Sequence, residues 1–364
     1  MSIFWLPTAG LGQMTVPIDH LGLLAAVIGH RHNIFMPNQY LRSALWGLLL
    51  VAGLSLPALP AEKDVPLQDT YVAANGIRLH CVSTGRGELV MFLHGFPEFW
   101  YEWKDQLREF GTDHRVVAPD LRGYNLSDKP PAVDDYRVPV LLEDIRALAD
   151  HLRKGRKFIL VGHDWGGALA WSFAAAHPEY LDKLVIINAP YPAVFGKLLA
   201  SDPNQQKASQ YMFLFRSPQA EEKLAANNYA FLNRIVLDDL LKTGAMTQAD
   251  QKAYLQAWSQ PGALTGGLNY YRASRLGPPA PAQIESQIGP SDSEFGRDTA
   301  QTLIRVPTLV IWGEKDPALP PENIDNLQHY VPQLTIKRIP EGSHWVIHEK
   351  PSEVNGYIRA FIGR

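Results

Sequence analysis

The chain has 364 residues, of which 46% are hydrophobic and 20% are charged, a composition typical of a globular protein and not of a disordered one. Its 34 Lys and Arg nearly balance its 37 Asp and Glu, and the net charge of −3 indicates no basic surface for nucleic acid. The single cysteine, Cys81, excludes an intrachain disulfide and a cysteine-based zinc site. A chain of this length accommodates one large domain with a smaller inserted one.

The N-terminal extension, residues 1–61, carries the pattern of a secretory signal peptide. Arg42 precedes an apolar run from Ala44 to Leu56, and small residues follow up to Ala61. The run is shorter than the roughly 20 residues that a membrane span needs, so we expect no stable span in the mature chain. Because signal peptides begin close to their basic residue, we expect translation to start at Met36, and not at Met1, and the product to be periplasmic or secreted. The alternatives are an uncleaved anchor or an N-terminal tail on a cytoplasmic protein.

Strand and helix patterns alternate from about Val65 onward. Asn75-Gly76, the strongest short hairpin signal, separates two strands at 69–74 and 77–84. The strands expected after this hairpin are at 88–93, 115–118, 158–161, 184–187, 308–312 and 335–339. Helices are expected at 141–152, 166–176 and 351–362. Such alternation predicts a mostly parallel sheet with helices on both of its faces.

The alternation is interrupted between about 193 and 302. This stretch has helical periodicity and no short apolar strand, apart from a Pro-rich loop at 278–281. A helical block inserted before the sheet resumes resembles a lid. We therefore expect the first part of the catalytic core at 66–192, a helical lid at 193–302 and the second part of the core at 303–364.

The segment 158–176 predicts a nucleophile. It is a strand that enters a helix through Gly162-His163-Asp164-Trp165-Gly166, which has the spacing of a nucleophile elbow with Asp in place of the usual Ser. Side chains at Gly162 and Gly166 would collide with the neighbouring strand and helix. A carboxylate is already ionised near pH 7 and can attack a saturated carbon to form an ester. Asp164 therefore favours displacement at carbon over acyl transfer; the alternative is a simple helix cap.

An acid and a histidine follow Asp164 in the order that this elbow requires. Asp316 and His344 each lie in a loop directly after one of the last two strands, at the sheet edge where ligands bind. His344 would take a proton from water, and Asp316 would orient the imidazole and stabilise its charge. Glu314 is a rival for the acid. Asn188 ends the strand after the elbow, but its amide cannot stabilise a histidinium.

The turn His94-Gly95-Phe96-Pro97 follows a buried strand and predicts an oxyanion hole. It would point the backbone N–H of Phe96 into the cavity, and the N–H of Trp165 would be the second donor. The Phe96–Pro97 bond is a candidate cis peptide. We expect His94, Pro97 and Trp165 to line an apolar substrate pocket.

Four motifs together resemble the epoxide hydrolases of the α/β-hydrolase superfamily. They are HGFPEFWYEW at 94–103, DLRGYNLSDKP at 120–130, GHDWGG at 162–167 and GSHW at 342–345. The resemblance covers roughly residues 66–364 and implies the α/β-hydrolase fold. The first and third motifs are specific for the branch with a carboxylate nucleophile, which also contains dehalogenases.

The resemblance also implies two lid tyrosines that donate to the epoxide oxygen. Tyr211 lies in a segment similar to the first tyrosine site of the family, and Tyr271 in one similar to the second. Tyr270 is the alternative for the second site, and packing is the alternative for each tyrosine.

These residues predict the hydrolysis of a small apolar epoxide to a vicinal diol through a covalent Asp164 ester, without a metal or an organic cofactor. A haloalkane dehalogenase with the same triad is the alternative enzyme. It would need further halide donors, but Phe96 stands where an Asn would be required, and Trp258 is the one lid tryptophan. A non-catalytic binding protein would not need Asp164, Asp316 and His344 together.

Overall fold

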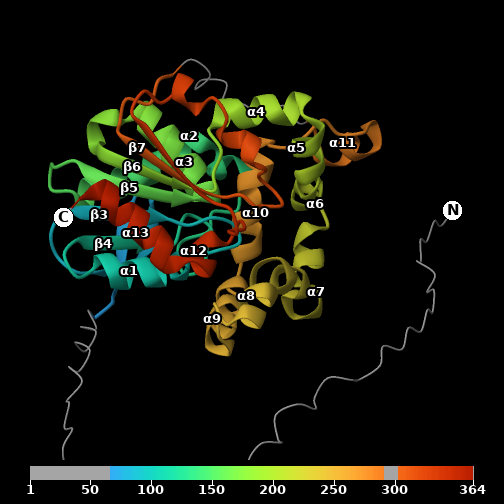
Figure 1. Cartoon of the computed structure of the whole chain (residues 1–364). Coiled ribbons are helices and arrows are strands. Elements are labelled where there is room, and N and C mark those ends of the chain that lie inside the picture. Colours follow the sequence, from blue (N-terminus) through green and yellow to red (C-terminus); the bar gives the residue numbers. More distant parts are fainter. Residues whose placement is uncertain (1–65, 291–301, 364) are drawn as a thin grey trace, which may run out of the picture. The chain divides into compact units, whose positions relative to one another are not determined.

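The computed structural model describes residues 66–290 and 302–363 (Figure 1). Eight strands form one sheet in the order β1-β2-β4-β3-β5-β6-β7-β8. β1–β2 and β2–β4 pair antiparallel, and the remaining neighbours pair parallel. The predicted fold class, a mostly parallel sheet with helices on both faces, is confirmed. The N-terminal extension, and with it the predicted signal peptide, lies outside the described residues.

The strands agree with the sequence pattern to within a few residues. Their bounds are β1 Gln68–Ala74, β2 Ile77–Thr84, β3 Leu89–Leu93, β4 Arg115–Pro119, β5 Phe158–His163, β6 Leu181–Ile187, β7 Thr308–Gly313 and β8 Leu334–Ile339. The first two strands form the predicted hairpin, with Ala74 opposite Ile77. Asn75 and Gly76 between them have φ angles of 47° and 77°, as a type I′ turn requires.

Helices cover both faces of the sheet and also follow β6 as a continuous block. Their bounds are α1 Lys104–Phe110, α2 Val138–Leu152, α3 Asp164–Ala176, α4 Pro192–Ser201, α5 Pro203–Ala208, α6 Tyr211–Arg216, α7 Ala220–Leu232, α8 Asp238–Thr243, α9 Gln248–Trp258, α10 Ala263–Ser274, α11 Ala282–Ile288, α12 Val346–Glu349 and α13 Pro351–Ile362. The helices α4 to α11 lie between β6 and β7 in the chain (Figure 1). The domain boundaries near 192 and 302 stay a prediction.

Alternation along each strand divides the core into two layers. On β5, Ile159 and Val161 belong to the layer that α1 and α13 complete, whereas Phe158 and Leu160 belong to the layer with α2 and α3. The sheet is therefore buried on both faces, which explains why its central strands read as unbroken apolar runs. The core holds the C-terminal strand ends in fixed register, and the segments that leave those ends carry Asp164, Asp316 and His344. Among the described residues, no helix is long and apolar enough to span a membrane.

Candidate active site

Asp164 occupies a strained turn between β5 and α3. Its φ angle is 47°, a left-handed conformation that is costly for a residue with a side chain. A Cβ on Gly162 would lie 2.4 Å from the Gly166 oxygen, and a Cβ on Gly166 would lie 2.1 Å from the Leu93 oxygen on β3. Only glycine fits at both places, as the sequence predicted, and the close packing holds Asp164 at the C-terminal edge of the sheet.

The loops after β7 and β8 bring Asp316 and His344 to the same edge. Nδ1 of His344 donates to Oδ2 of Asp316 at 2.6 Å. Its Nε2 therefore faces the nucleophile and lies 3.7 Å from Oδ2 of Asp164. This separation is too long for a direct hydrogen bond and leaves the imidazole beside the carboxyl carbon that water would attack. The structure thus brings together the three residues that the sequence singled out as nucleophile, acid and base.

The two carboxylates control the charge of His344. Burial alone would lower the pKa of His344, but the charge and hydrogen bond of Asp316, and then the charge of Asp164, raise it from the usual 6.5 to about 9. Burial opposes the ionisation of Asp316, yet the charge of His344 and its hydrogen bond lower the pKa of Asp316. With Asp164 ionised, His344 is consequently a cation near pH 7.

Asn188 and Glu314, the two other residues weighed for the acid, have different contacts. Asn188 is fully buried, and its Nδ2 donates to Oδ2 of Asp316 at 2.9 Å. Its Oδ1 accepts the N–H of Gly313 at 2.8 Å, so the amide ties the end of β6 to the acid loop after β7. Glu314 instead accepts from Arg338 at 2.9 Å. The geometry therefore favours Asp316 as the partner of His344.

The turn after β3 supplies a donor to the nucleophile. The N–H of Phe96 donates to Oδ1 of Asp164 at 2.8 Å, and the Phe96–Pro97 peptide is cis. Trp165 follows Asp164 in the first turn of α3, where backbone N–H groups point out of the helix end. Oδ1 therefore lies where an oxyanion would need its hydrogen bonds, while Oδ2 is left to react.

Asp164 opens into a cavity with about 350 Å³ of empty space. Its lining is apolar apart from Asp164 and two tyrosines, and it consists of Asp164, Trp165, Ala168, Pro190, Phe195, Tyr211, Met212, Tyr271, Leu276 and Leu319. Tyr211 comes from α6 and Tyr271 from α10, with ring centroids 6.3 Å apart. Burial and then the charge of Asp164 raise the pKa of Tyr211. Burial, then Tyr211 and Asp164, raise the pKa of Tyr271, so both phenols keep their protons.

Tyr270, the alternative to Tyr271, is held elsewhere. Its hydroxyl donates to the carbonyl of Arg122 at 2.9 Å, and the side chain is fully buried. Of the two neighbouring tyrosines, the structure places only Tyr271 in the cavity with Asp164.

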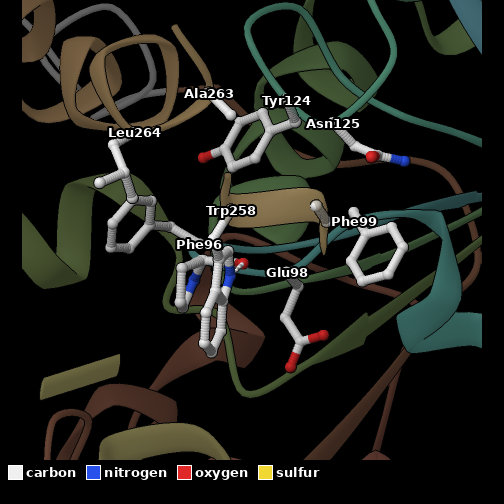
Figure 2. Close-up of a pocket in the computed structure, with 10 residues that line it drawn as sticks. Phe96, Glu98, Phe99, Tyr124, Asn125, Trp258, Ala263 and Leu264 are labelled. Carbon is white, nitrogen blue, oxygen red and sulfur yellow. Dashed lines mark hydrogen bonds between the residues drawn. The ribbon is translucent and has the colours of Figure 1, made fainter. Parts of the chain in front are cut away.

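Two of the predicted pocket residues do not line the cavity of Asp164. His94 is 0% exposed, its Nδ1 donates to the Gly95 carbonyl, and its Nε2 accepts the N–H of Leu121 at 2.9 Å. His94 stabilises the turn because its two ring nitrogens bind the Gly95 carbonyl and the Leu121 N–H. Pro97 lines a second cavity, together with Phe96, Tyr124 and Trp258, with about 260 Å³ of empty space. Figure 2 shows the side chains that line this second cavity.

Trp258, the lid tryptophan, also belongs to the second cavity. Its indole N–H donates to the Pro97 carbonyl at 2.7 Å. This hydrogen bond joins α9 to the turn and occupies the indole N–H, and Trp258 is not among the residues that line the cavity of Asp164. Trp258 therefore does not supply the second halide donor that a dehalogenase would require.

Sequence reasoning missed a group of buried ionisable residues next to this turn. Glu98 and Glu102 are each 1% exposed. Glu98 accepts from the hydroxyl of Tyr254 and lies 3.3 Å from Nε2 of His348. Burial opposes the charges of Glu98 and His348, but their mutual attraction lowers the pKa of Glu98 and raises that of His348. The available signal was the pair of acidic residues within the otherwise aromatic run 94–103.

No metal site is evident in the part of the chain that the structure describes: no three His, Cys, Asp or Glu side chains there are arranged to hold an ion. Cys81 is buried in the core.

Known proteins resemble the chain over most of its length. Residues 88–351 match the model of a family described as alpha/beta hydrolase fold. The chain is 40% identical over 297 residues to the AB hydrolase superfamily protein YfhM of Bacillus subtilis, covering 80% of this chain and 96% of that protein. It is 37% identical over 321 residues to epoxide hydrolase 4 of Mus musculus, covering 85% and 82%. The crystal structure of a mutant epoxide hydrolase from Bacillus megaterium superposes with a TM-score of 0.73 at 38% identity, covering 81% of this chain and 100% of the other.

Proposed function

This chain belongs to the α/β-hydrolase family and to its epoxide hydrolase branch, and we propose that it hydrolyses small apolar epoxides to vicinal diols through a covalent ester on Asp164. One observation carries the proposal: the carboxylate of Asp164 and the phenols of Tyr211 and Tyr271 line the same apolar cavity. An epoxide needs a nucleophile at carbon and a proton donor at oxygen, and this cavity has both.

In the first half-reaction, Oδ2 of Asp164 attacks an epoxide carbon and breaks its bond to the ring oxygen. Oδ1 stays on the N–H of Phe96, so the carboxylate is oriented before the substrate arrives. The hydroxyls of Tyr211 and Tyr271 donate to the oxygen as it becomes an alkoxide, and one of them transfers its proton. The product of this step is the alkyl ester of Asp164.

Ester formation changes the protonation of the base. The negative charge of Asp164 helps to raise the pKa of His344 to about 9, and the ester has no such charge. The pKa of His344 therefore falls when the ester forms, and the imidazole loses its proton at the step that requires a base. Asp316 remains beside Nδ1 and keeps Nε2 directed toward the ester.

In the second half-reaction, His344 takes a proton from water while the water oxygen bonds to the carboxyl carbon of Asp164. The oxyanion forms on Oδ1 and is stabilised by the N–H groups of Phe96 and Trp165. The intermediate collapses and breaks the bond between the carboxyl carbon of Asp164 and Oδ2, so Oδ2 leaves with the substrate carbon as the second diol hydroxyl and receives the proton from His344. The water oxygen remains in the carboxyl group of Asp164, whose proton restores the tyrosine that gave up its own in the first half-reaction. Asp164 is then a carboxylate again, and the reaction consumes one water per diol.

A paired turnover assay tests the proposal. The purified chain from Ala61 onward is offered styrene oxide and, separately, 1-bromobutane, with Asp164→Ala as the control. We expect diol formation that the control lacks, no bromide release, and a mass increase on Asp164 that accumulates in His344→Gln. Bromide release without diol would move the assignment to a haloalkane dehalogenase. Neither activity, together with no ester, would overturn the assignment of these substrates and leave a narrower substrate or a binding role on this fold.

We also propose export through the signal peptide of the N-terminal extension, supported by the Arg42 and Ala44–Leu56 pattern. Full-length protein expressed in a bacterium should appear in the periplasmic fraction with its new N-terminus near Ala61. N-terminal sequencing checks this, and an intact extension in the cytoplasmic fraction contradicts it.

A further inference from the structure

Glu102 is a buried carboxyl group that the reaction above leaves unused. It lies in the short 3₁₀ helix Trp100–Trp103 and is 1% exposed. Its Oε2 accepts the N–H of Gly95 at 3.0 Å. Gly95 directly precedes Phe96, whose own N–H holds the nucleophile. One oxygen of Glu102 thus fixes the backbone that carries the oxyanion donor.

The other oxygen reaches the nucleophile elbow. Oε1 of Glu102 contacts Nδ1 of His163, and neither atom has another hydrogen-bond partner among the described residues. His163 is 1% exposed, and its Nε2 lies 2.9 Å from the carbonyl oxygen of His344. A carbonyl only accepts, so Nε2 of His163 carries a hydrogen. Through His163, Glu102 therefore connects the oxyanion turn with the backbone of the catalytic base.

The contact between Glu102 and His163 needs one proton between its two atoms. A neutral His163 that is protonated on Nε2 has a bare Nδ1, and only an O–H of Glu102 can donate to it. The alternative is a carboxylate beside an imidazolium with the same heavy-atom positions. The charged and titratable groups that surround the pair decide between the two states, and they are Glu98, His348, His344, Asp164 and His94.

These neighbours favour the uncharged pair. The ring of His344, which is a cation, lies 4.7 Å from the ring of His163, so a second cation there is disfavoured. Glu98 is an anion and opposes a second carboxylate at Glu102. Burial, followed by the charge of Glu98, raises the pKa of Glu102 well above its usual range. Burial, followed by the charge of His344, lowers the pKa of His163 to about 3.

We propose that Glu102 is a positioning residue that works as an un-ionised carboxylic acid, donating its O–H to Nδ1 of His163 while accepting the N–H of Gly95. These hydrogen bonds connect the turn at 94–97, the turn at Asp164 and the loop that carries His344, and they add no charge to the site. The absence of charge matters because an ionised Glu102 raises the pKa of His344 and makes its deprotonation harder. The positioning role rests on the proposed function, whereas the protonation state does not.

Two variants of Glu102 and one control variant test the hydrogen bonds of Glu102 separately from its charge. Glu102→Gln keeps a donor for His163 and an acceptor for Gly95 and has no charge, so it reproduces the un-ionised acid. Glu102→Ala removes both hydrogen bonds. Glu88→Gln is the matched control, since Glu88 is exposed and directly precedes β3, at the opposite end of that strand from the turn at 94–97. The infrared difference spectrum between the unmodified protein and each Gln variant reports the protonation state, because a protonated carboxyl has a C=O stretch that a carboxylate lacks.

We expect the protonated band at pH 7 in the Glu102→Gln difference and a carboxylate band in the Glu88→Gln difference. In single-turnover hydrolysis of the Asp164 ester, Glu102→Gln should stay within about threefold of the unmodified protein with the same pH profile, and Glu102→Ala should be at least about tenfold slower. A carboxylate band for Glu102, a Glu102→Gln rate as low as that of Glu102→Ala, or an unimpaired Glu102→Ala would each overturn the proposal.

If Glu102→Ala does not fold, the infrared band and the pH profile of Glu102→Gln still decide. If the unmodified protein turns over no epoxide, the proposed function fails and the positioning role fails with it. The infrared band then still establishes whether Glu102 is un-ionised, so the two failures are distinguishable.

Discussion

Replacing Tyr271 with Phe removes one hydroxyl from the cavity and leaves the packing around it nearly intact. The ring of Tyr271 lies against Trp165, Phe215 and Phe96, with centroids 5.2, 5.1 and 5.5 Å away. A phenylalanine ring makes the same contacts. The change therefore tests the proton donor and not the shape of the pocket.

The expected loss follows from what the hydroxyl stabilises. In the proposed first half-reaction, Tyr271 donates to an oxygen that becomes an alkoxide, and removal of one such donor costs about 2.7–4 kcal/mol, a factor of about 10²–10³ in rate. Tyr211 remains as a second donor, so we place Tyr271→Phe at the lower end, about 10²-fold slower in ester formation. The double variant with Tyr211→Phe should lose further activity, because neither phenol then remains in the cavity.

Tyr270→Phe is the matched control, since it makes the same chemical change one position away. Its hydroxyl donates to the Arg122 carbonyl, and removing it leaves a buried acceptor unpaired at a cost of about 1–3 kcal/mol in folding free energy. We therefore expect Tyr270→Phe to unfold at lower denaturant but to form the ester at the unmodified rate. Rapid-quench mass spectrometry of the Asp164 ester and urea titration measure the two effects. Equal rate losses in both variants, or none in Tyr271→Phe, would refute the assignment of roles.

Three further predictions concern the base, the acid and the packing of α10. Ester hydrolysis should accelerate as pH rises and reach a plateau with an apparent pKa below 9, because neutral His344 is the base and the ester lacks the charge that raises its pKa; a single-turnover pH series that decreases with pH contradicts this. Asp316→Asn should slow ester hydrolysis by about 10³–10⁴-fold. Adding Asn188→Asp to this variant should raise the rate again by at least about tenfold, since the two side chains are hydrogen-bonded neighbours. An unchanged rate in the same assay would argue that a carboxylate at position 188 cannot replace Asp316. Gly266→Ala should lower the free energy of unfolding by about 1–3 kcal/mol, because its Cβ would lie 2.3 Å from the backbone oxygen of Gly123. Gly356→Ala is the control, since no atom lies within 4 Å of its Cβ, and it should leave the stability unchanged. Thermal unfolding measures both variants, and an equal loss of stability in the two would contradict the prediction.

The sequence predicted those features that depend on local chemistry. The Asn75-Gly76 turn needs two residues that accept positive φ, and the elbow needs glycine at 162 and 166, so both can be identified from neighbouring residues alone. Asp316 and His344 were predictable because parallel strands end at a common edge, which makes two loops far apart in sequence converge there. The apolar runs of β5 and β6 likewise follow from burial on both faces of the sheet.

What the sequence did not predict depends on which way a side chain points in the assembled fold. Tyr270 and Tyr271 are adjacent, and only packing on α10 decides that one hydroxyl bonds to Arg122 and the other faces the cavity. His94 was expected to line the pocket, but its ring holds two backbone groups of its own turn. The helix α1 was also missed, because its seven residues are too few to show a clear period.

The arrangement of charge explains why the acid lies after β7 while an amide lies after β6. These two strands are neighbours in the sheet, with Ile187 opposite Ile311, so the side chains that follow them meet at the same point beside His344. Carboxylates at both places would repel each other and would raise the pKa of His344 further above 9, which would hinder its release of a proton after ester formation. Asn188 instead donates to Asp316 and keeps one negative charge there. A single carboxylate is sufficient to orient the imidazole, and it leaves Asp164 as the charge whose loss on ester formation switches His344 from acid to base.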